Sequence, residues 1–209
     1  MYTVKLVPEY LIGIDEVGRG PLAGPLCLGA FWTERRKLPI ILSAFRGIRD
    51  SKQLSAEERI KWFLKIRRLA QKGYCRYEST FVRAQIIDRD GMGSALRYAV
   101  RRLLANLEAS PSKSFLLLDG MLRAPSFFPM QESIIHGDEN EPLIAAASII
   151  AKVRRDRYMV ALSKIFPEYG FETHKGYGTR RHYNALKEFG VCRVHRRSFL
   201  KNLSLPTRG

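Results

Sequence analysis

The stretch Leu11-Ile-Gly-Ile-Asp-Glu-Val-Gly-Arg-Gly-Pro21 is the most informative part of this 209-residue chain. A short apolar run leads into two adjacent carboxylates, Asp15 and Glu16, and a Gly-Arg-Gly turn follows at once. The apolar run predicts a buried strand, and carboxylates at the end of such a strand are costly unless a cation joins them. The bare backbone N–H groups and the guanidinium of the turn suit a phosphate ester. The stretch therefore predicts a sheet with a cation site and an anion-binding turn at one strand end.

The charge of the chain favours a polyanionic partner. Lys and Arg number 36 against 20 Asp and Glu, which gives a net charge of +16 and a pI near 10.1. A nucleic acid or an acidic membrane surface would fit this charge, and binding to nucleic acid would weaken as salt rises. A hydrophobic content of 45% supports a packed globule and argues against a disordered chain.

The cysteines and apolar runs favour a cytoplasmic protein with no membrane partner. Cys27, Cys75 and Cys192 are odd in number and form no Cys-x-x-Cys, which predicts a reducing compartment without disulfides or a zinc site. The four histidines also lack close ligand spacing. No secretory leader opens the chain, and residues 143–151, the longest apolar run, fall far short of the roughly 20 residues of a spanning helix.

Periodicity and turn signals predict an α/β domain with a central mixed sheet flanked by helices. The expected strands are residues 11–14, 27–32, 74–81, 114–118 and 132–135, with a Gly/Pro-rich turn at 18–25. The expected helices are 55–72, opened by the capping box Ser55-x-x-Glu58, then 92–107, 142–166 and 179–189. Residues 34–52 show no periodicity and are expected to form a basic loop. In helix 142–166 the residues expected to face inward are Ile149, Val153, Val160 and Ile165.

Acids follow three of the expected strands: Asp15 and Glu16, then Asp119, then Asp138. Functional sites in open α/β sheets favour the carboxyl ends of strands. Clustered carboxylates repel one another, and hard divalent ions relieve this; oxygen ligands without Cys or His select Mg²⁺ or Mn²⁺. Two such ions about 4 Å apart can hold the attacking and leaving oxygens of a phosphoryl displacement.

Each acid alone has a simpler interpretation. Asp119-Gly120 is typical of a strand-ending turn, Asp138 of a loop or helix-start charge, and Asp15-Glu16 of a pair with nearby arginines. The fit of all four to one pattern favours a shared site.

Six blocks in order along the chain resemble the ribonuclease HII family, and together they cover about residues 11–199. They are Asp15-Glu-Val-Gly-Arg-Gly-Pro-Leu-Ala-Gly-Pro25, Asp50-Ser-Lys-Gln-Leu-Ser55, Leu117-Leu-Asp-Gly120, Gly137-Asp138 with Ala145-Ala-Ala-Ser-Ile-Ile-Ala-Lys-Val-Arg-Arg-Asp156, Tyr169-Gly-Phe-Glu-Thr-His-Lys-Gly-Tyr-Gly-Thr179, and His195-Arg-Arg-Ser-Phe199.

This resemblance implies an RNase H-like fold and an endoribonuclease that uses two Mg²⁺ or Mn²⁺ ions. Its substrates would be RNA–DNA hybrids and single ribonucleotides in duplex DNA, cut on the 5′ side to leave a 5′-phosphate and a 3′-hydroxyl. Such cutting would remove ribonucleotides during DNA repair and replication. The resemblance makes Asp15, Glu16, Asp119 and Asp138 the catalytic, metal-binding acids.

The resemblance also implies a substrate-binding set. Gly18, Arg19 and Gly20 would read the ribonucleotide 2′-OH and its phosphates, the 2′-OH being the group that distinguishes RNA from DNA. Tyr177 would stack on the sugar of the following deoxynucleotide, although a packing aromatic in a Gly-rich loop would give the same signal. Lys52 would contact a phosphate.

The chain is expected to be one domain, residues 1–209, and a monomer. Within it, an RNase H-like core spans about 11–166, a helical substrate-binding portion spans about 167–203, and residues 204–209 form a disordered tail. The sequence does not identify a protein partner such as a sliding clamp.

Several residues near these blocks have less specific roles. Ser148 and Lys152 are expected to support the site or contact substrate, and Asp156 to form a structural salt bridge. Residues 195–197 are expected to contact the duplex backbone or to be a basic surface run. His136 stands where many relatives have Lys, and Gly91-Met-Gly93 weakens the start of helix 92–107.

Three other classes of protein are alternatives to the ribonuclease HII interpretation. Ribonuclease HIII usually lacks the arginine of Gly-Arg-Gly and has an additional N-terminal domain, for which the ten residues before the first strand leave no room. A resolvase-like two-metal nuclease would not need the turn that reads the 2′-OH. A non-catalytic nucleic-acid-binding domain would not need the four acids.

Overall fold

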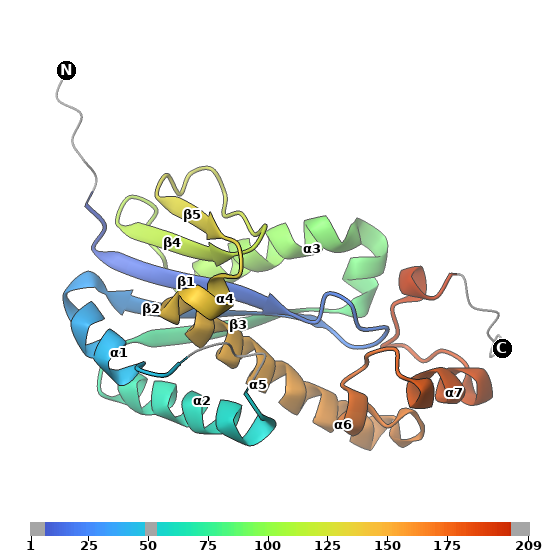
Figure 1. Ribbon diagram of the computed structural model, residues 1–209. Helices are drawn as coiled ribbons and strands as arrows, with labels where there is room; N and C mark the ends of the chain where they lie inside the picture. The colour runs from blue at the N-terminus through green and yellow to red at the C-terminus, as the bar shows by residue number, and fades with distance from the viewer. Residues whose placement is uncertain (1–6, 49–53, 202–209) are drawn as a thin grey trace.

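A five-stranded mixed sheet forms the centre of the molecule. The computed structural model describes residues 7–48 and 54–201 (Figure 1). The strand order is β3-β2-β1-β4-β5, and the strands are β1 (Tyr10–Val17), β2 (Leu26–Glu34), β3 (Arg76–Val82), β4 (Ser114–Asp119) and β5 (Gln131–Ile134). The β1–β2 and β2–β3 pairs are antiparallel, whereas β1–β4 and β4–β5 are parallel. The mixed α/β fold with flanking helices predicted from the sequence is confirmed.

The register of β1 leaves its acidic end free on one side. Its parallel pairing with β4 stops at Ile14↔Leu118, while its antiparallel pairing with β2 continues to Val17↔Cys27. Residues 15–17 are therefore held by β2 and lie past the end of the β1–β4 ladder. This is the edge of the sheet at which β4 ends.

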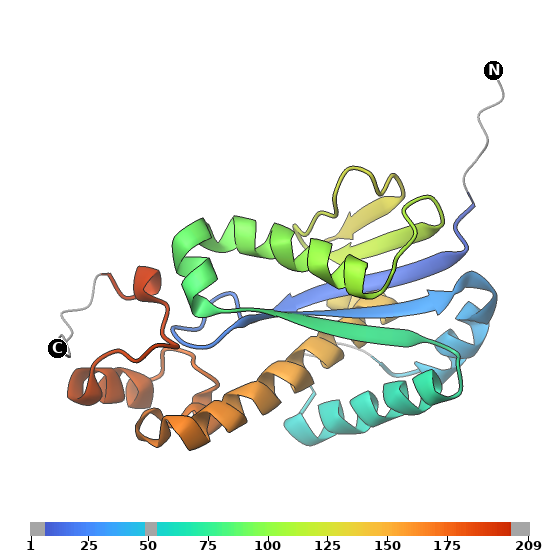
Figure 2. The same ribbon diagram turned by 180° about the vertical axis from the view of Figure 1, so that it is seen from behind.

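Helices cover both faces of the sheet (Figures 1 and 2). On one face α3 (Ala84–Asn106) packs with alternate residues of β1 and β4, such as Ile12, Ile14 and Leu118. On the other face lie α5 (Pro142–Ile165) and α2 (Ala56–Gln71), with α1 (Leu38–Ala44) beside them. Each face has its own buried apolar cluster, as the period-2 alternation of half-buried strands requires.

Two glycines allow α5 to lie directly on β1 and β2. A Cβ atom on Gly13 would come within 2.3 Å of the Leu143 carbonyl, and one on Gly29 within 2.3 Å of the Ala147 carbonyl oxygen. Since no side chain separates helix from sheet there, the backbones approach closely. Residues 143–151 of α5 are consequently buried all round.

The caps expected for three helices are present. Ser55 and Glu58 form the capping box of α2, Pro142 lies in the first turn of α5, and Thr179 accepts a hydrogen bond from His182 N–H at the start of α7 (Arg180–Phe189). Helix α3 differs from its expected range, because it begins at Ala84 and is broken at Gly91, whose φ is 78°. The glycine pair that weakens the predicted start is thus a kink inside a longer helix.

The expected basic loop over residues 34–52 is wrong for its first part. A 3-10 turn, η1 (Arg35–Lys37), and helix α1 occupy residues 35–44. Only Ile41 of α1 is fully buried, so a helix of two turns with one inward residue produces no periodicity to detect. Residues 49–52 of this range lie outside the described part of the chain.

The inward face expected for α5 is right in its first half and wrong in its second. Ile149 and Val153 are buried, but Val160 and Ile165 are 41% and 58% exposed. Beyond the sheet the helix packs instead through Met159 and Leu162 on the C-terminal portion. The buried face rotates because the packing partner changes.

The C-terminal portion adds short helices and an apolar cluster of its own. It comprises η2 (Pro167–Tyr169), α6 (Phe171–His174), α7 and η3 (Arg197–Phe199). Tyr169, Phe171 and Leu186 are its buried centre, packed against Met159 of α5. The figures show it at one end of the sheet, beyond the carboxyl end of β1.

The three cysteines are unpaired, with Cys27 and Cys75 buried and Cys192 half-buried. None of the helices among the described residues has the length and apolar character needed to cross a bilayer.

Candidate active site

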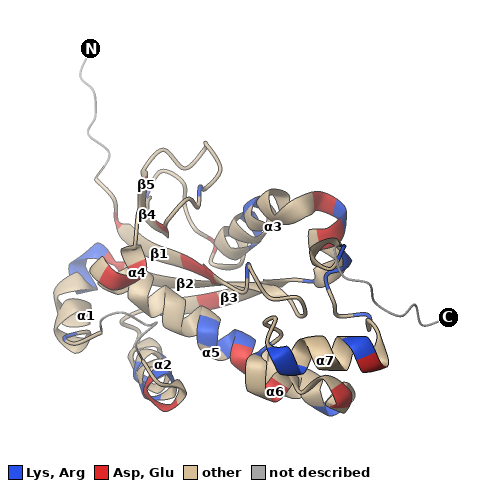
Figure 3. Ribbon diagram, turned by 45° about the vertical axis from the view of Figure 1, so that its right-hand side comes forward, with Lys and Arg blue, Asp and Glu red and all other residues tan. Residues whose placement is uncertain are grey.

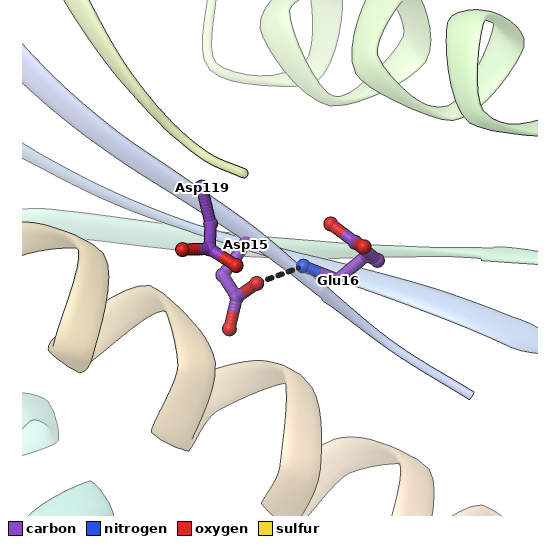
Figure 4. A group of neighbouring side chains, drawn as sticks. All are labelled: Asp15, Glu16 and Asp119. Atoms are coloured by element: carbon purple, nitrogen blue, oxygen red, sulfur yellow. Dashed lines mark hydrogen bonds between the residues drawn. The ribbon is translucent and has the colours of Figure 1, made fainter. Parts of the chain in front are cut away.

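Asp15, Glu16 and Asp119 meet where β1 and β4 end. Each offers one carboxylate oxygen, and the three oxygens lie within 4.8 Å of one another. Figure 4 shows Asp15 and Asp119 side by side, with Glu16 farther along β1. The Glu16 N–H donates a 2.7 Å hydrogen bond to Asp15 Oδ1. Adjacent strand residues normally face opposite ways, so this convergence needs the end of the β1–β4 ladder just before it.

Asp138 is joined to this group through Asp119. The carboxylate of Asp119 accepts hydrogen bonds from the Gly137 and Asp138 N–H groups at 2.8 and 3.3 Å. These residues open the short helix α4 (Gly137–Asn140), and Asp138 is 2% exposed. The preceding His136 takes a left-handed conformation with its side chain outward, so the residue that departs from the family pattern lies in solvent.

The electrostatics of Asp15 indicate a site that favours a cation. Burial raises the pKa of Asp15 well above its ordinary value, and the charges of Glu16, Asp119 and Asp138 raise it further. A hydrogen bond from Ser148 on α5 lowers the same pKa, which agrees with the expected supporting role of Ser148. A divalent ion would stabilise several carboxylates that lie close together in a largely buried site.

Glu16 is a second carboxylate whose surroundings favour a cation. Burial raises its pKa, and Arg19 opposes that change through an ion pair of 3.1 Å to Glu16 Oε1. The other oxygen, Oε2, is buried and has no hydrogen-bond partner. An orphaned carboxylate oxygen among all-oxygen donors fits a hard cation such as Mg²⁺ or Mn²⁺.

The turn after β1 exposes two of the three residues expected to meet substrate. Gly18 is buried, whereas Arg19 and Gly20 are exposed. Gly18 has a φ of 88°, and a Cβ there would come within 2.3 Å of Arg155 Nε. Glycine is required at position 18 for both reasons.

Tyr177 lies on the same side of the molecule as the turn. Its ring is 44% exposed, and the Arg155 guanidinium lies 5.7 Å from the ring centroid. Since Arg155 also packs against Gly18, one buried side chain contacts both expected substrate elements. The exposed ring is available to a ligand and is not a core aromatic.

Residues 195–197 differ from the expected basic surface run. His195 and Arg196 are 3% and 0% exposed, and only Arg197 lies in solvent. The local sequence does not predict the burial of Arg196, because its hydrogen-bond partners are carbonyl groups far away in the chain, at Gly18, Arg19 and Gly24.

Three histidines that show no ligand spacing in the sequence gather in the C-terminal portion. His182 Nε2 lies 3.0 Å from His195 Nε2, and His174 stacks on His182 at 4.5 Å. Their nitrogens bond backbone groups and one another, so they brace the C-terminal portion.

Two other expected residues have different outcomes. Asp156 pairs with Arg59 at 3.5 Å, which agrees with the structural salt bridge predicted for it. Lys52 lies outside the described residues. Figure 3 shows acidic residues at the end of β1 and basic residues along the neighbouring part of α5.

Comparison with known sequences points to one family. The sequence pattern of the family described as Ribonuclease HII matches residues 12–202. The Ribonuclease HII of Caldicellulosiruptor bescii is 40% identical over 202 residues, which cover 95% of this chain and 92% of that protein.

Solved structures agree with the fold. The Archaeoglobus fulgidus RNase HII, solved as a PCNA:RNase HII complex, matches with a TM-score of 0.71 at 25% identity, covering 95% of this chain and 97% of that one. Bst-RNase HIII in complex with Mn²⁺ matches with a TM-score of 0.66 at 20% identity, covering 94% of this chain and 66% of that one.

Proposed function

Since this chain belongs to the ribonuclease HII family and is an endoribonuclease of the ribonuclease H class, we propose that it cuts 5′ to ribonucleotides in duplex DNA as well as the RNA strand of RNA–DNA hybrids. The observation that carries the proposal is the group formed by Asp15, Glu16 and Asp119, with ligand oxygens within 4.8 Å. Beside it lies an exposed turn that could read a 2′-OH. The role of the enzyme would be removal of ribonucleotides from DNA.

The four acids Asp15, Glu16, Asp119 and Asp138 would hold two Mg²⁺ or Mn²⁺ ions. When bound, such ions supply an activated water and stabilise the leaving oxygen of an in-line phosphoryl displacement. A relative of the same fold was solved with Mn²⁺, which supports this metal class. The products would be a 5′-phosphate and a free 3′-hydroxyl.

Residues of the chain itself orient the reaction. Ser148 holds Asp15, and the N–H groups of Gly137 and Asp138 hold Asp119, so these carboxylates are fixed before substrate binds. Arg19 is anchored to Glu16 and lies at the surface, where its guanidinium could also meet a phosphate. The acids and the turn are therefore linked by an ion pair.

Substrate choice would depend on the turn and on Tyr177. Gly18, Arg19 and Gly20 would contact the ribose 2′-OH and flanking phosphates, and Tyr177 would stack on the sugar of the next deoxynucleotide. The basic C-terminal portion, about residues 167–203, would hold the duplex against the core. Lys52, which lies outside the described residues, would contact a phosphate.

One assay tests this function. A DNA duplex with a single ribonucleotide is incubated with the protein in Mg²⁺ or Mn²⁺, beside an all-DNA duplex and a reaction in EDTA. We expect a single cut 5′ to the ribonucleotide when metal is present and no cut in EDTA. The all-DNA duplex should not be cut. Cutting of the all-DNA duplex would favour a resolvase-like nuclease, and binding without any cut would favour a non-catalytic domain.

A further inference from the structure

Arg196 is a fully buried cation whose hydrogen bonds all go to one turn. Its exposed fraction is 0%, and burial lowers its pKa to about 10, so it stays charged at neutral pH. The guanidinium donates to the carbonyl oxygens of Arg19 at 2.8 Å, Gly18 at 2.7 Å, and Gly24 at 3.0 and 3.1 Å. Across residues 7–48 and 54–201 no carboxylate forms an ion pair with it. Its hydrogen-bond partners are therefore the backbone carbonyls of the turn, and the Phe199 ring lies 5.3 Å from the guanidinium carbon.

These bonds fix the direction of two backbone N–H groups. In a trans peptide the carbonyl and the following N–H point in opposite directions, and the chain has no cis peptide among the described residues. The carbonyls of Gly18 and Arg19 point to Arg196, so the N–H groups of Arg19 and Gly20 point away from it. Arg19 and Gly20 are exposed, and neither N–H donates a hydrogen bond to any residue that the structure describes. Two adjacent free N–H groups can donate to oxygen atoms of a bound ribonucleotide, its 2′-OH among them.

We propose that Arg196 is the positioning residue of this turn: by holding the Gly18, Arg19 and Gly24 carbonyls inward, it presents the Arg19 and Gly20 N–H groups to the ribonucleotide. The inference rests on the proposed function, in which the turn reads the ribonucleotide. Because Arg196 is fully buried, it would act through the turn and not by contact with substrate.

The chain around Arg196 extends this role to Tyr177. The Arg196 backbone N–H donates to the Leu22 carbonyl at 2.8 Å, so residues 195–196 are bonded to the turn through the backbone as well as through the guanidinium. The neighbouring His195 lies 3.0 Å from His182, and His182 Nδ1 donates to the Tyr177 carbonyl at 2.9 Å. One segment thus fixes the turn and the tyrosine loop relative to each other.

Arginine suits this position and lysine does not. A guanidinium carries five N–H donors in a planar fork, which here reach three carbonyls, whereas an ammonium is one point charge on a flexible stem. Arg196→Lys therefore keeps the charge and loses the geometry. Arg102→Lys is the matched control, because Arg102 is exposed on α3, on the far side of the sheet from the α5 face.

The test is binding in EDTA, so that no cleavage occurs. Dissociation constants are measured by fluorescence anisotropy for a duplex with one ribonucleotide and for the same duplex in all-DNA form. In the wild type we expect tighter binding of the ribonucleotide duplex. In Arg196→Lys the ratio of the two constants should fall about tenfold towards one, with all-DNA binding within about twofold of wild type, since bonds to a charged donor are lost. Arg102→Lys should keep the wild-type ratio.

The outcomes separate the two proposals. A wild-type ratio of one contradicts the reading of the 2′-OH by the turn, and the role of Arg196 falls with it. A wild-type ratio above one that Arg196→Lys retains overturns the role of Arg196 alone. Parallel weakening of both duplexes would also overturn it, because a merely structural residue would act in that way.

A second measurement applies even when the variant does not fold. In wild-type protein the Arg19 and Gly20 amide protons should shift downfield in NMR spectra on addition of the ribonucleotide duplex, and less with the all-DNA duplex. Unchanged Arg19 and Gly20 amides in a complex whose other signals move would overturn the proposal.

Discussion

The Asp119 carboxylate accepts a hydrogen bond from the Gly137 N–H at 2.8 Å, and this bond joins the end of β4 to the start of α4. It places a fourth acid, Asp138, beside Asp15, Glu16 and Asp119, because Asp138 follows Gly137 directly. The acids of two parallel strands and one short helix are thereby arranged by the backbone itself. Substitutions in this arrangement can separate chemistry from folding.

Asp119→Asn is expected to abolish cleavage while keeping the fold. The amide oxygen can still accept the Gly137 hydrogen bond, but the charge that a metal ion requires is lost. We expect kcat to fall on the order of a thousandfold, corresponding to several kcal/mol of transition-state stabilisation. Single-turnover cleavage of the ribonucleotide duplex measures this. Asp156→Asn is the control, since Asp156 pairs with Arg59; activity retained by Asp119→Asn would contradict the site.

Gly18→Ala is expected to destabilise the protein. The residue needs a φ of 88°, and the added Cβ would meet Arg155 Nε at 2.3 Å. A loss of about 2 kcal/mol in the free energy of unfolding follows from the backbone strain alone. Gly20→Ala has open space around its Cβ, so it should stay within about 0.5 kcal/mol of wild type in the same urea titration. Equal stability of the two variants would contradict this account of the turn.

Gly13→Ala is expected to push α5 off the sheet. Its Cβ would lie 2.3 Å from the Leu143 backbone, which cannot move without the helix. We expect a loss of about 3 kcal/mol in unfolding free energy. Gly93→Ala in α3 is the contrasting change, because its Cβ would touch only the tip of Arg97 at 3.6 Å, and it should stabilise the protein by up to about 1 kcal/mol. A neutral Gly13→Ala would show that helix and sheet are less closely packed.

Acid should weaken the C-terminal portion through its buried histidines. Burial lowers the pKa of His182 and His195 to about 4, below the ordinary 6.5 that they regain on unfolding. The unfolded chain therefore binds more protons between pH 6.5 and 4, and stability falls as the pH is lowered through that window. The expected loss is on the order of 3 kcal/mol for each histidine, and this source contributes nothing above pH 6.5.

Urea unfolding at several pH values measures this loss, and variants identify its source. His182→Asn should flatten the slope, whereas His136→Asn, whose side chain is 66% exposed, should not. Both variants retain Asp15, so its contribution cancels in the comparison. The raised pKa of Asp15 makes the stability of the fold rise as the pH falls, which is opposite to the effect of the histidines. A wild-type slope in His182→Asn would contradict the prediction.

Tyr177→Ala is expected to reduce cleavage at a single ribonucleotide more than cleavage of a long hybrid. The ring is 44% exposed, so its loss should cost contact with the nucleotide and not core packing. Aromatic stacking on a base contributes about 1–3 kcal/mol, and with a similar contact to the sugar kcat/KM for the single ribonucleotide should fall about tenfold. Tyr177→Phe should retain most activity, and Tyr98→Ala, an exposed tyrosine on α3, should change neither substrate. An equal fall for both substrates would contradict a role in choosing junctions.

The acids at the strand ends are predictable from the sequence. Apolar runs and the Gly turn are local signals, and they mark Asp15, Glu16 and Asp119 as strand-end residues. The sequence predicts one site for four acids including Asp138, and the structure brings carboxylate oxygens of Asp15, Glu16 and Asp119 within 4.8 Å of one another. Helix α1 was missed because a two-turn helix with one buried residue leaves no period to read.

Local sequence patterns are sufficient to predict the α/β class, the strand ends that carry the acids, and the helix caps at Ser55 and Thr179. Each of these depends on residues close together in the chain. The tertiary structure alone decided that Arg196 is buried beneath Gly18 and that the α5 face rotates after Val153. The physical reason is that burial of a charge, or of a helix face, depends on partners brought from far along the chain. No local pattern records them.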